Sequence, residues 1–306
     1  MSLIVTGSIG IDTVEAPTGS AESVLGGSAI YFAGAASYFG PVRLVGAVGE
    51  DFPDEYMEPF EHFGIDLQGL EKRQGSKTFR WHGRYHENMN QRDTVDVELN
   101  VLGEAPPPVP EAYKDSQFIF LANTHPDAQM ELLNQFPNRN IAVADTMNLW
   151  IENELDSLKK LLSQIEGLVL NDEEAFQLTD KSNIVRASEA ILEMGPRFVV
   201  VKKGEHGAFM MHRENGEEHM GALPAFAARD VVDPTGAGDS FAGGMMGYLA
   251  NANDASPAAL RTAMAYGTIV ASYNIESFSV HRMREIGKKD IDQRMQTYRN
   301  MLDFQI

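Results

Sequence analysis

The chain has 306 residues, 43% of them hydrophobic and 23% charged, which is an ordinary globular composition. No run of eighteen apolar residues occurs, so we expect neither a transmembrane helix nor a membrane partner, and the lack of cysteine excludes disulfides and thiolate metal sites. The 44 acidic and 25 basic residues give a formal charge of -19, which argues against nucleic acid as a partner. The N-terminus lacks the pattern of a secretion signal, and we expect a cytoplasmic protein.

The first segments predict the start of an α/β fold. Residues 3–9 form an apolar strand, and residues 28–39 carry Ala and aromatic side chains on most faces, which is typical of a buried helix. A strand at 42–48 and a helix at 53–63 follow.

A different pattern occupies the next forty residues. Residues 78–85 and 94–101 alternate polar and apolar side chains, which predicts strands with one solvated face. We expect them to form a small sheet outside the main fold, ended by the proline-rich linker at 106–110.

From residue 118 onward, strands and helices alternate. The predicted strands are 118–122, 141–144, 168–170 and 198–202, and the predicted helices are 127–136, 151–165, 172–178, 182–194, 236–249, 256–273 and 288–302. This alternation predicts a mainly parallel sheet covered by helices on both faces.

The stretch Asp233-Pro-Thr-Gly-Ala-Gly-Asp239 is the most specific motif. Its glycines allow successive backbone N–H groups to point inward at a helix start, which makes an anion site. A carboxylate in the first turn can accept a hydroxyl proton, so the spacing supplies two parts of phosphoryl transfer. The alternative is an ordinary loop followed by an acid that stabilises a helix start. Neither a P-loop nor a Rossmann glycine motif is present.

These residues, taken in order, resemble the ribokinase-like (PfkB-type) carbohydrate kinases over essentially the whole chain. The supporting motifs are Gly26-Gly27, Phe39-Gly40, Val45-Gly-Ala-Val-Gly-Glu-Asp51, Asn171-Asp-Glu-Glu174, Val200-Val-Lys-Lys-Gly-Glu-His-Gly207 and the glycine-rich stretch. The resemblance implies one kinase domain over 1–306, with a three-layer α/β/α fold and a β-sheet lid whose strands lie at about 12–25 and 67–104.

The resemblance also implies roles for the glycine-rich turn. Asp239 is expected to be the general base, and Gly236, Ala237 and Gly238 are expected to form the anion hole.

The expected acceptor side is built around Asp12. By the resemblance, Asp12 binds substrate hydroxyls together with Gly26 and Gly27, although an Asp here also suits a simple turn. Tyr31 stands where many sugar and nucleoside kinases of the family carry Asn, which predicts a more aromatic pocket.

The expected nucleotide side carries ATP and Mg²⁺. The resemblance assigns Asn171 and Glu174 to Mg²⁺ and its waters, and Lys202, Gly204 and Gly207 to the nucleotide. Glu174 as a helix-stabilising acid, and Lys202 as half of a solvated Lys202-Lys203 pair, are the alternatives.

A further cation is implied by the same resemblance. Asp233 and Thr235 match a monovalent-cation site found in part of the family, for which K⁺ is the candidate.

The lid residues 80–86 are dense in rings and donors. Trp81 or Tyr85 can stack on a sugar or base, and Arg84 can meet an anionic group. Alternatively, the lid sheet pairs with a second subunit, which predicts a homodimer.

The sequence therefore predicts an ATP-dependent kinase that phosphorylates an alcohol of a sugar or sugar derivative. A nucleoside kinase of the same family is one alternative. A non-catalytic metabolite-binding relative is another, although an intact Asp239 argues against it.

Overall fold

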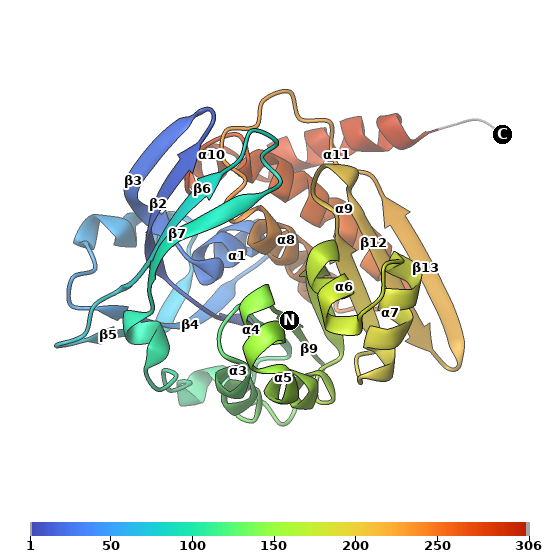
Figure 1. Ribbon diagram of the computed structural model, residues 1–306, viewed down its shortest axis with the longest axis horizontal. Coiled ribbons are helices and arrows are strands. Elements are labelled where there is room, and N and C mark those ends of the chain that lie inside the picture. Colours follow the sequence, from blue (N-terminus) through green and yellow to red (C-terminus); the bar gives the residue numbers. More distant parts are fainter. Residues whose placement is uncertain (1, 304–306) are drawn as a thin grey trace.

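A computed structural model describes residues 2–303 and contains two sheets of unequal size (Figure 1). The larger sheet has nine strands in the order β13-β12-β11-β10-β9-β8-β1-β4-β5. Their bounds are Leu3–Thr6 (β1), Val42–Gly49 (β4), Asp66–Arg73 (β5), Phe118–Leu121 (β8), Ile141–Asp145 (β9), Gly167–Asn171 (β10), Phe198–Lys202 (β11), Ala208–Glu214 (β12) and Glu217–Leu223 (β13). Neighbours from β11 to β5 pair in parallel, and β12 is antiparallel to both of its neighbours, which confirms the mainly parallel sheet.

Side chains alternate along the central strands and divide the core in two. Leu3 and Val5 of β1 belong to one buried cluster, whereas Ile4 between them belongs to the other. The first cluster packs under α1 (Ser28–Ser37), α8 (Ala237–Ala252), α9 (Pro257–Asn274), α10 (His281–Glu285) and α11 (Lys288–Leu302). The second packs under α3 (Pro126–Leu133), α4 (Asn148–Asn153), α5 (Leu155–Leu162), α6 (Asp172–Thr179) and α7 (Ile184–Glu193). The two clusters give the three-layer α/β/α architecture that the sequence predicts.

The smaller sheet is the lid, with the strand order β3-β2-β6-β7. Its strands are Gly10–Ala16 (β2), Gly19–Gly26 (β3), Phe79–Tyr85 (β6) and Arg92–Glu98 (β7). Figure 1 shows it on the opposite side of the molecule from the β12–β13 hairpin. The pair β2–β6 is parallel, and β2–β3 and β6–β7 are antiparallel.

One segment assigned to the lid from sequence lies elsewhere. Residues 66–73 form β5, which pairs in parallel with β4 at the edge of the central sheet. The reason is packing, because Leu67 and Leu70 contact the main apolar core and Gly69 is buried against β4. A short loop then connects β5 to the lid. The helix α2 (Glu58–His62) connects β4 to β5.

Candidate active site

The glycine-rich turn begins α8, the helix nearest the centre of the molecule in Figure 1. Gly236 is its N-cap with φ 74°, a left-handed conformation that favours glycine. A Cβ at Gly236 would lie 2.3 Å from the ring of Tyr31, so the ring packs directly against the turn and leaves room only for glycine. Asp239 lies in the first turn of α8, next to Gly238 and close to the unpaired N–H groups of the helix start.

A lysine lies against this turn. Lys202 is the last residue of β11, and a Cβ at Gly238 would be 2.7 Å from its Nζ. Burial raises the pKa of Asp239, Glu174 and Asp145, and the charge of Lys202 opposes the increase at all three. The charge of Lys202 is therefore felt at three carboxyl groups, and its ammonium lies against the glycine-rich turn.

The Asn171–Glu174 motif forms the start of α6. The Asn171 side chain accepts the N–H of Glu174 at 2.7 Å, and Glu174 Oε2 accepts the N–H of Asn171 at 2.8 Å. This is a capping box, so one oxygen of Glu174 stabilises the start of the helix, as the alternative interpretation of this residue expects. The other oxygen remains available within a buried carboxylate next to Lys202.

The residues expected on the acceptor side lie on β2 and at the end of β3. Asp12 is 3% exposed, and a Cβ at Gly26 would lie 1.9 Å from its Oδ2, so its carboxylate lies directly over that glycine. Burial, and then the nearby charge of Asp233, raise the pKa of Asp12 to about 7, against a hydrogen bond from the Gly27 backbone. The charge of Asp239 makes a smaller contribution to the same increase.

Several buried polar atoms beneath the turn lack partners among the described residues. These atoms are Asp12 Oδ1, Tyr31 Oη, Asp145 Oδ1, Asp233 Oδ2 and Asn274 Oδ1. The other Asp233 oxygen accepts the N–H of Thr235 at 2.8 Å, and Asn274 Nδ2 donates to the carbonyl of Thr235 at 2.7 Å. Because buried polar groups normally have partners, these atoms indicate places where a ligand or ion binds.

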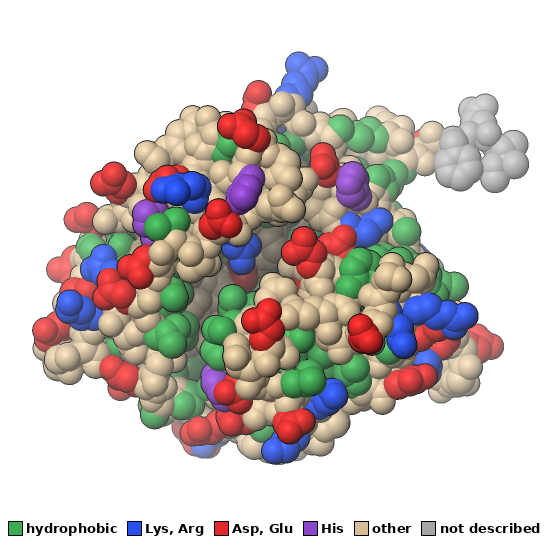
Figure 2. All heavy atoms as spheres, in the orientation of Figure 1, with side chains coloured by type: hydrophobic (Ala, Val, Ile, Leu, Met, Phe, Trp, Pro, Cys, Tyr) green, Lys and Arg blue, Asp and Glu red, His purple; other side chains and the backbone are tan. Residues whose placement is uncertain are grey.

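The lid is closed over the turn. Tyr85, at the end of β6, contacts Thr235 through their hydroxyl groups at 3.2 Å, and Thr18 donates to the carbonyl of Val232 at 2.6 Å. Figure 2 shows a hollow between the lid and helices α4 and α6, with basic and acidic side chains on its wall. The lid thus covers a charged hollow.

The tip of the lid also reaches the turn that follows β11. Asn90 Nδ2 donates to Glu205 Oε1 at 2.9 Å, and a Cβ at Gly204 would lie 3.0 Å from Asn90 Oδ1. Gly204 and Gly207 both have positive φ in this turn. Gly204 therefore lies beside the lid tip, whereas Gly207 lies against Leu223 and Pro224, at the end of β13.

Arg84 is not brought together with the other predicted residues. Its guanidinium donates twice to Glu15, with Nε at 2.6 Å from Oε2, and it lies on the other face of the lid sheet from its neighbour Tyr85. Three residues that the sequence analysis missed do approach the site: Asp145, Asn274 and the lid residue Arg92. Asp145 ends a buried strand, and the carboxyl end of a parallel strand was the signal that could have revealed it.

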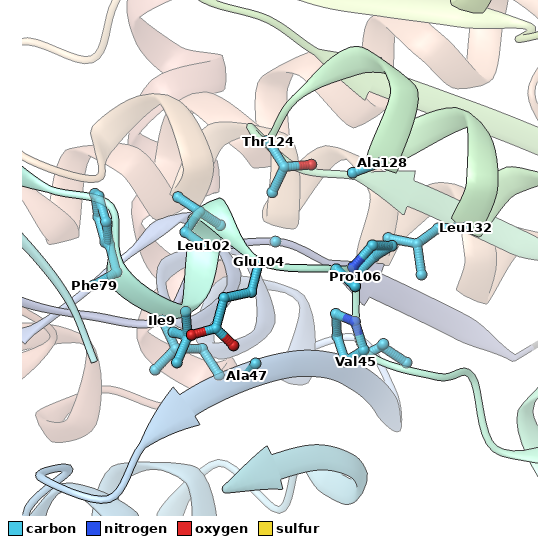
Figure 3. Close-up of a pocket in the computed structure, with 14 residues that line it drawn as sticks. Ile9, Val45, Ala47, Phe79, Leu102, Glu104, Pro106, Thr124, Ala128 and Leu132 are labelled. Carbon is cyan, nitrogen blue, oxygen red and sulfur yellow. The ribbon is translucent and has the colours of Figure 1, made fainter. Parts of the chain in front are cut away.

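An apolar pocket lies at the base of the lid (Figure 3). Ile9, Phe79 and Leu102 line one side of it, and Thr124 and Glu104 supply polar groups. Its lining does not include Asp12 or Asp239, but Ile9 precedes β2 directly and touches Gly27. The pocket is therefore a neighbour of the acceptor side and not the transfer centre itself.

Two other kinds of feature, a metal-binding cluster and a membrane-spanning helix, are absent from the described residues 2–303. No group of three or more His, Cys, Asp or Glu side chains there can hold a metal ion on its own. Within the same residues, no helix is both long and apolar enough to span a bilayer.

An anion-binding helix start beside a half-buried carboxylate and a lysine suits phosphoryl transfer to a hydroxyl. With the α/β/α fold and the closing lid, this arrangement defines the class of ATP-dependent small-molecule kinases. Comparison with known families agrees: the chain belongs to the pfkB family of carbohydrate kinases, whose family model matches residues 3–285.

Known relatives include proteins with different acceptors. A cytidine kinase from Thermococcus kodakarensis is 31% identical over 258 residues, which cover 81% of this chain and 88% of the relative. A Burkholderia thailandensis nucleoside kinase solved with inosine superposes with a TM-score of 0.77 at 19% identity, covering 97% of this chain and 98% of that one. A protein from E. coli provisionally called ribokinase II, solved with ATP and Mg²⁺, gives a TM-score of 0.77 at 17% identity, covering 97% and 99%. The two structures show that the fold is shared.

Proposed function

We propose that this protein transfers the γ-phosphoryl group of ATP to an alcohol hydroxyl of a sugar or sugar derivative, with Asp239 as the general base. The observation that carries the proposal is the turn Gly236–Gly238, which has Lys202 on one side and Asp239 on its first helical turn. A preorganised cradle of N–H groups and a cation stabilises charge that develops on a transferring group.

The proposed step needs only a proton transfer and a displacement. The acceptor oxygen bonds to the γ-phosphorus as the bond from that phosphorus to the ADP oxygen breaks, and the acceptor proton moves to Asp239. Burial raises the pKa of Asp239 to about 6, against the charges of Lys202 and Arg92, so it is ionised at neutral pH and still basic enough to take the proton. The closed lid excludes water that would otherwise receive the phosphoryl group.

The residues present fit Mg²⁺ bound through ATP. Mg²⁺ typically uses one or two carboxylates, substrate phosphates and waters, and it neutralises phosphate charge when bound. The free oxygen of Glu174 and the unpartnered oxygen of Asp145 are the available protein groups, with Asn171 beside them. Gly204, beside the lid tip, and Gly207, at the other end of the same turn, would bound the nucleotide.

A monovalent cation is proposed below the turn, for which K⁺ is the candidate. The unpartnered Asp233 Oδ2 and Asn274 Oδ1 are buried oxygens of the kind such an ion needs, and Thr235 lies between the two residues. A midpoint of thermal unfolding that is equal in KCl and choline chloride would contradict this site.

Among possible acceptors, the lid favours a nucleoside. Trp81 pairs in register with Asp12 on parallel strands, so both side chains project from the same face of the lid sheet. A Cβ at Gly83 would lie 1.9 Å from the indole, so the ring packs over that glycine. A base would stack on the part of the ring that the Arg92 guanidinium, 5.7 Å from its centroid, leaves uncovered. The apolar pocket beside Asp12 and the likeness to a cytidine kinase support the same choice.

The test is a panel of nucleosides and free sugars, assayed for ADP release with Mg²⁺-ATP. We expect nucleosides to be phosphorylated faster than ribose and other free sugars. Trp81→Ala should lower kcat/KM for the best nucleoside by roughly tenfold, because stacking on one base contributes that order of affinity, and Trp81→Phe should restore most of it. A free sugar as the best acceptor contradicts the nucleoside choice, and tight acceptor binding without turnover supports the non-catalytic alternative.

We also propose a homodimer formed through the lid. The strand β7 is the edge of the lid sheet, it is exposed along its whole length, and Val95, Val97 and Leu99 are 46%, 47% and 43% exposed. The strand is mostly charged, but Val95 and Val97 are exposed on it and its backbone is unpaired on one side, which is where a second copy would pair.

A further inference from the structure

Arg92 begins β7, the strand of the lid sheet that pairs with β6, and it is solvent-exposed. It pairs in register with Tyr85 across antiparallel strands, so the two side chains share one face of the lid. Tyr85 on that face contacts Thr235 of the glycine-rich turn at 3.2 Å. The guanidinium of Arg92 therefore faces the turn that begins α8.

Arg92 differs from its lid neighbours in its partners. Arg80 is paired with Asp51 at 2.9 Å and Arg84 with Glu15 at 2.6 Å, whereas Arg92 forms no ion pair with a carboxylate of the described chain. Its guanidinium instead lies 5.7 Å from the ring centroid of Trp81, whose indole donates to Thr94 at 3.3 Å. The Arg92 side chain also hydrogen-bonds the Tyr85 hydroxyl, and its remaining N–H donors have no carboxylate partner among the described residues.

The charge of Arg92 acts across the hollow. It lowers the pKa of Asp239 and of Glu174, against the larger effect of burial on each. Lys202 acts on the same two carboxyl groups from β11. Two cations from separate elements, one on the lid and one on the central sheet, therefore flank the carboxylate at the start of α8.

The position of Arg92 depends on the closed lid. Asn90, two residues earlier, is bonded to Glu205 at 2.9 Å on the far side of the hollow. Because the hairpin is anchored at this tip and at Tyr85, opening the lid would remove Arg92 from the turn.

We propose that Arg92 binds the transferring phosphoryl group from the lid side, opposite Lys202, and neutralises the charge that develops on it. This inference rests on the proposed kinase function. During the step described above Arg92 neither gains nor loses a proton, because a guanidinium stays charged at any working pH. Its planar fork of donors matches two phosphoryl oxygens at once, and its delivery by the lid makes transfer depend on closure.

The first test compares Arg92→Gln and Arg92→Lys with the wild type in steady-state kinetics. We expect kcat of the Gln variant to fall roughly 10²- to 10³-fold with the acceptor KM changed less than about threefold, since one charge-stabilising donor is removed. The Lys variant should recover part of the loss, and added guanidinium ion should partly restore the Gln variant. Arg213→Gln removes the same charge from the distant β12–β13 hairpin and should leave kcat unchanged. A Gln variant with kcat within about twofold of wild type overturns the proposal.

The second test needs no turnover. Calorimetric titration with ADP and with a non-hydrolysable ATP analogue should show about tenfold weaker analogue binding by Arg92→Gln, with ADP binding almost unchanged. Equal losses for both nucleotides overturn the proposal. If the analogue alone is weakened but the wild type phosphorylates no acceptor, the kinase function fails while the phosphoryl contact of Arg92 stands.

Discussion

Two carboxyl groups face the acceptor side of the site, and their surroundings separate their pKa values. Asp239 is close to Lys202 and Arg92, which offset much of the effect of burial and leave its pKa at about 6. Asp12 is close to Asp233 and has no such cations, so its pKa is about 7. The two cations favour the ionised form of Asp239, which is the form that a base needs. Asp12, with both forms present near neutral pH, can accept or donate a hydrogen bond to an acceptor hydroxyl.

This difference gives a pH dependence. Asp239 must be ionised to accept a proton, and its pKa is raised from 3.8 to about 6, so activity is lost on the acidic side of pH 6. We expect kcat to fall about tenfold per pH unit below that value and to level off above it. The measurement is kcat at saturating substrates from pH 4.5 to 8.5. The control is Asp12→Asn, in which kcat should still fall below pH 6. A kcat that stays constant down to pH 5 would contradict the assignment of Asp239.

At the scale of elements, the strand–helix repeats are predictable because each buried strand is a short apolar run followed by an amphipathic helix. The edges of the sheet are harder to predict. The segment 66–73 is short and mostly polar and directly precedes the lid strands in the chain, and only its contact with the main core places it as β5. The β12–β13 hairpin was not predicted, although Asn215-Gly216, both at positive φ, is a turn signal that sequence alone offers.

The candidate site divides in the same way. The glycine-rich turn is local in sequence, so its geometry at the start of α8 follows from its residues. Arg92, Asp145 and Asn274 act through contacts with segments far away in the chain, which no local pattern encodes. Whether Arg84 or Arg92 faces the site depends on which face of the lid sheet each side chain occupies. The register shift between β6 and β7 makes that face hard to predict from sequence.

The edge strand β7 carries the prediction on assembly. We expect the wild type to be a dimer in analytical ultracentrifugation, and the double substitution Val95→Lys with Val97→Lys to be a monomer, because like charges would face each other at the interface. Met220→Lys, on the edge strand β13 where Met220 is 55% exposed, is the matched control and should remain dimeric. A wild type that is monomeric at tens of micromolar would contradict the lid interface.

At the scale of the whole molecule, the fold places chemistry at one edge of the central sheet. Asp145, Asn171 and Lys202 end the adjacent strands β9, β10 and β11, and the start of α8 meets them there. The lid, which carries Asp12 and Arg92, closes this edge from the other side. In the proposed reaction, acceptor binding, phosphoryl contact and exclusion of water would all depend on the closed lid.

The most direct measurement is kcat of Asp239→Asn with Mg²⁺-ATP and the best acceptor of the panel. Asn keeps the shape of the side chain but cannot accept the proton, so we predict a loss of roughly 10²- to 10⁴-fold. Binding of ADP and of the acceptor, measured by calorimetry, should stay within a few fold of wild type. A variant that retains kcat within about threefold of wild type would contradict the claim that Asp239 is the base for phosphoryl transfer.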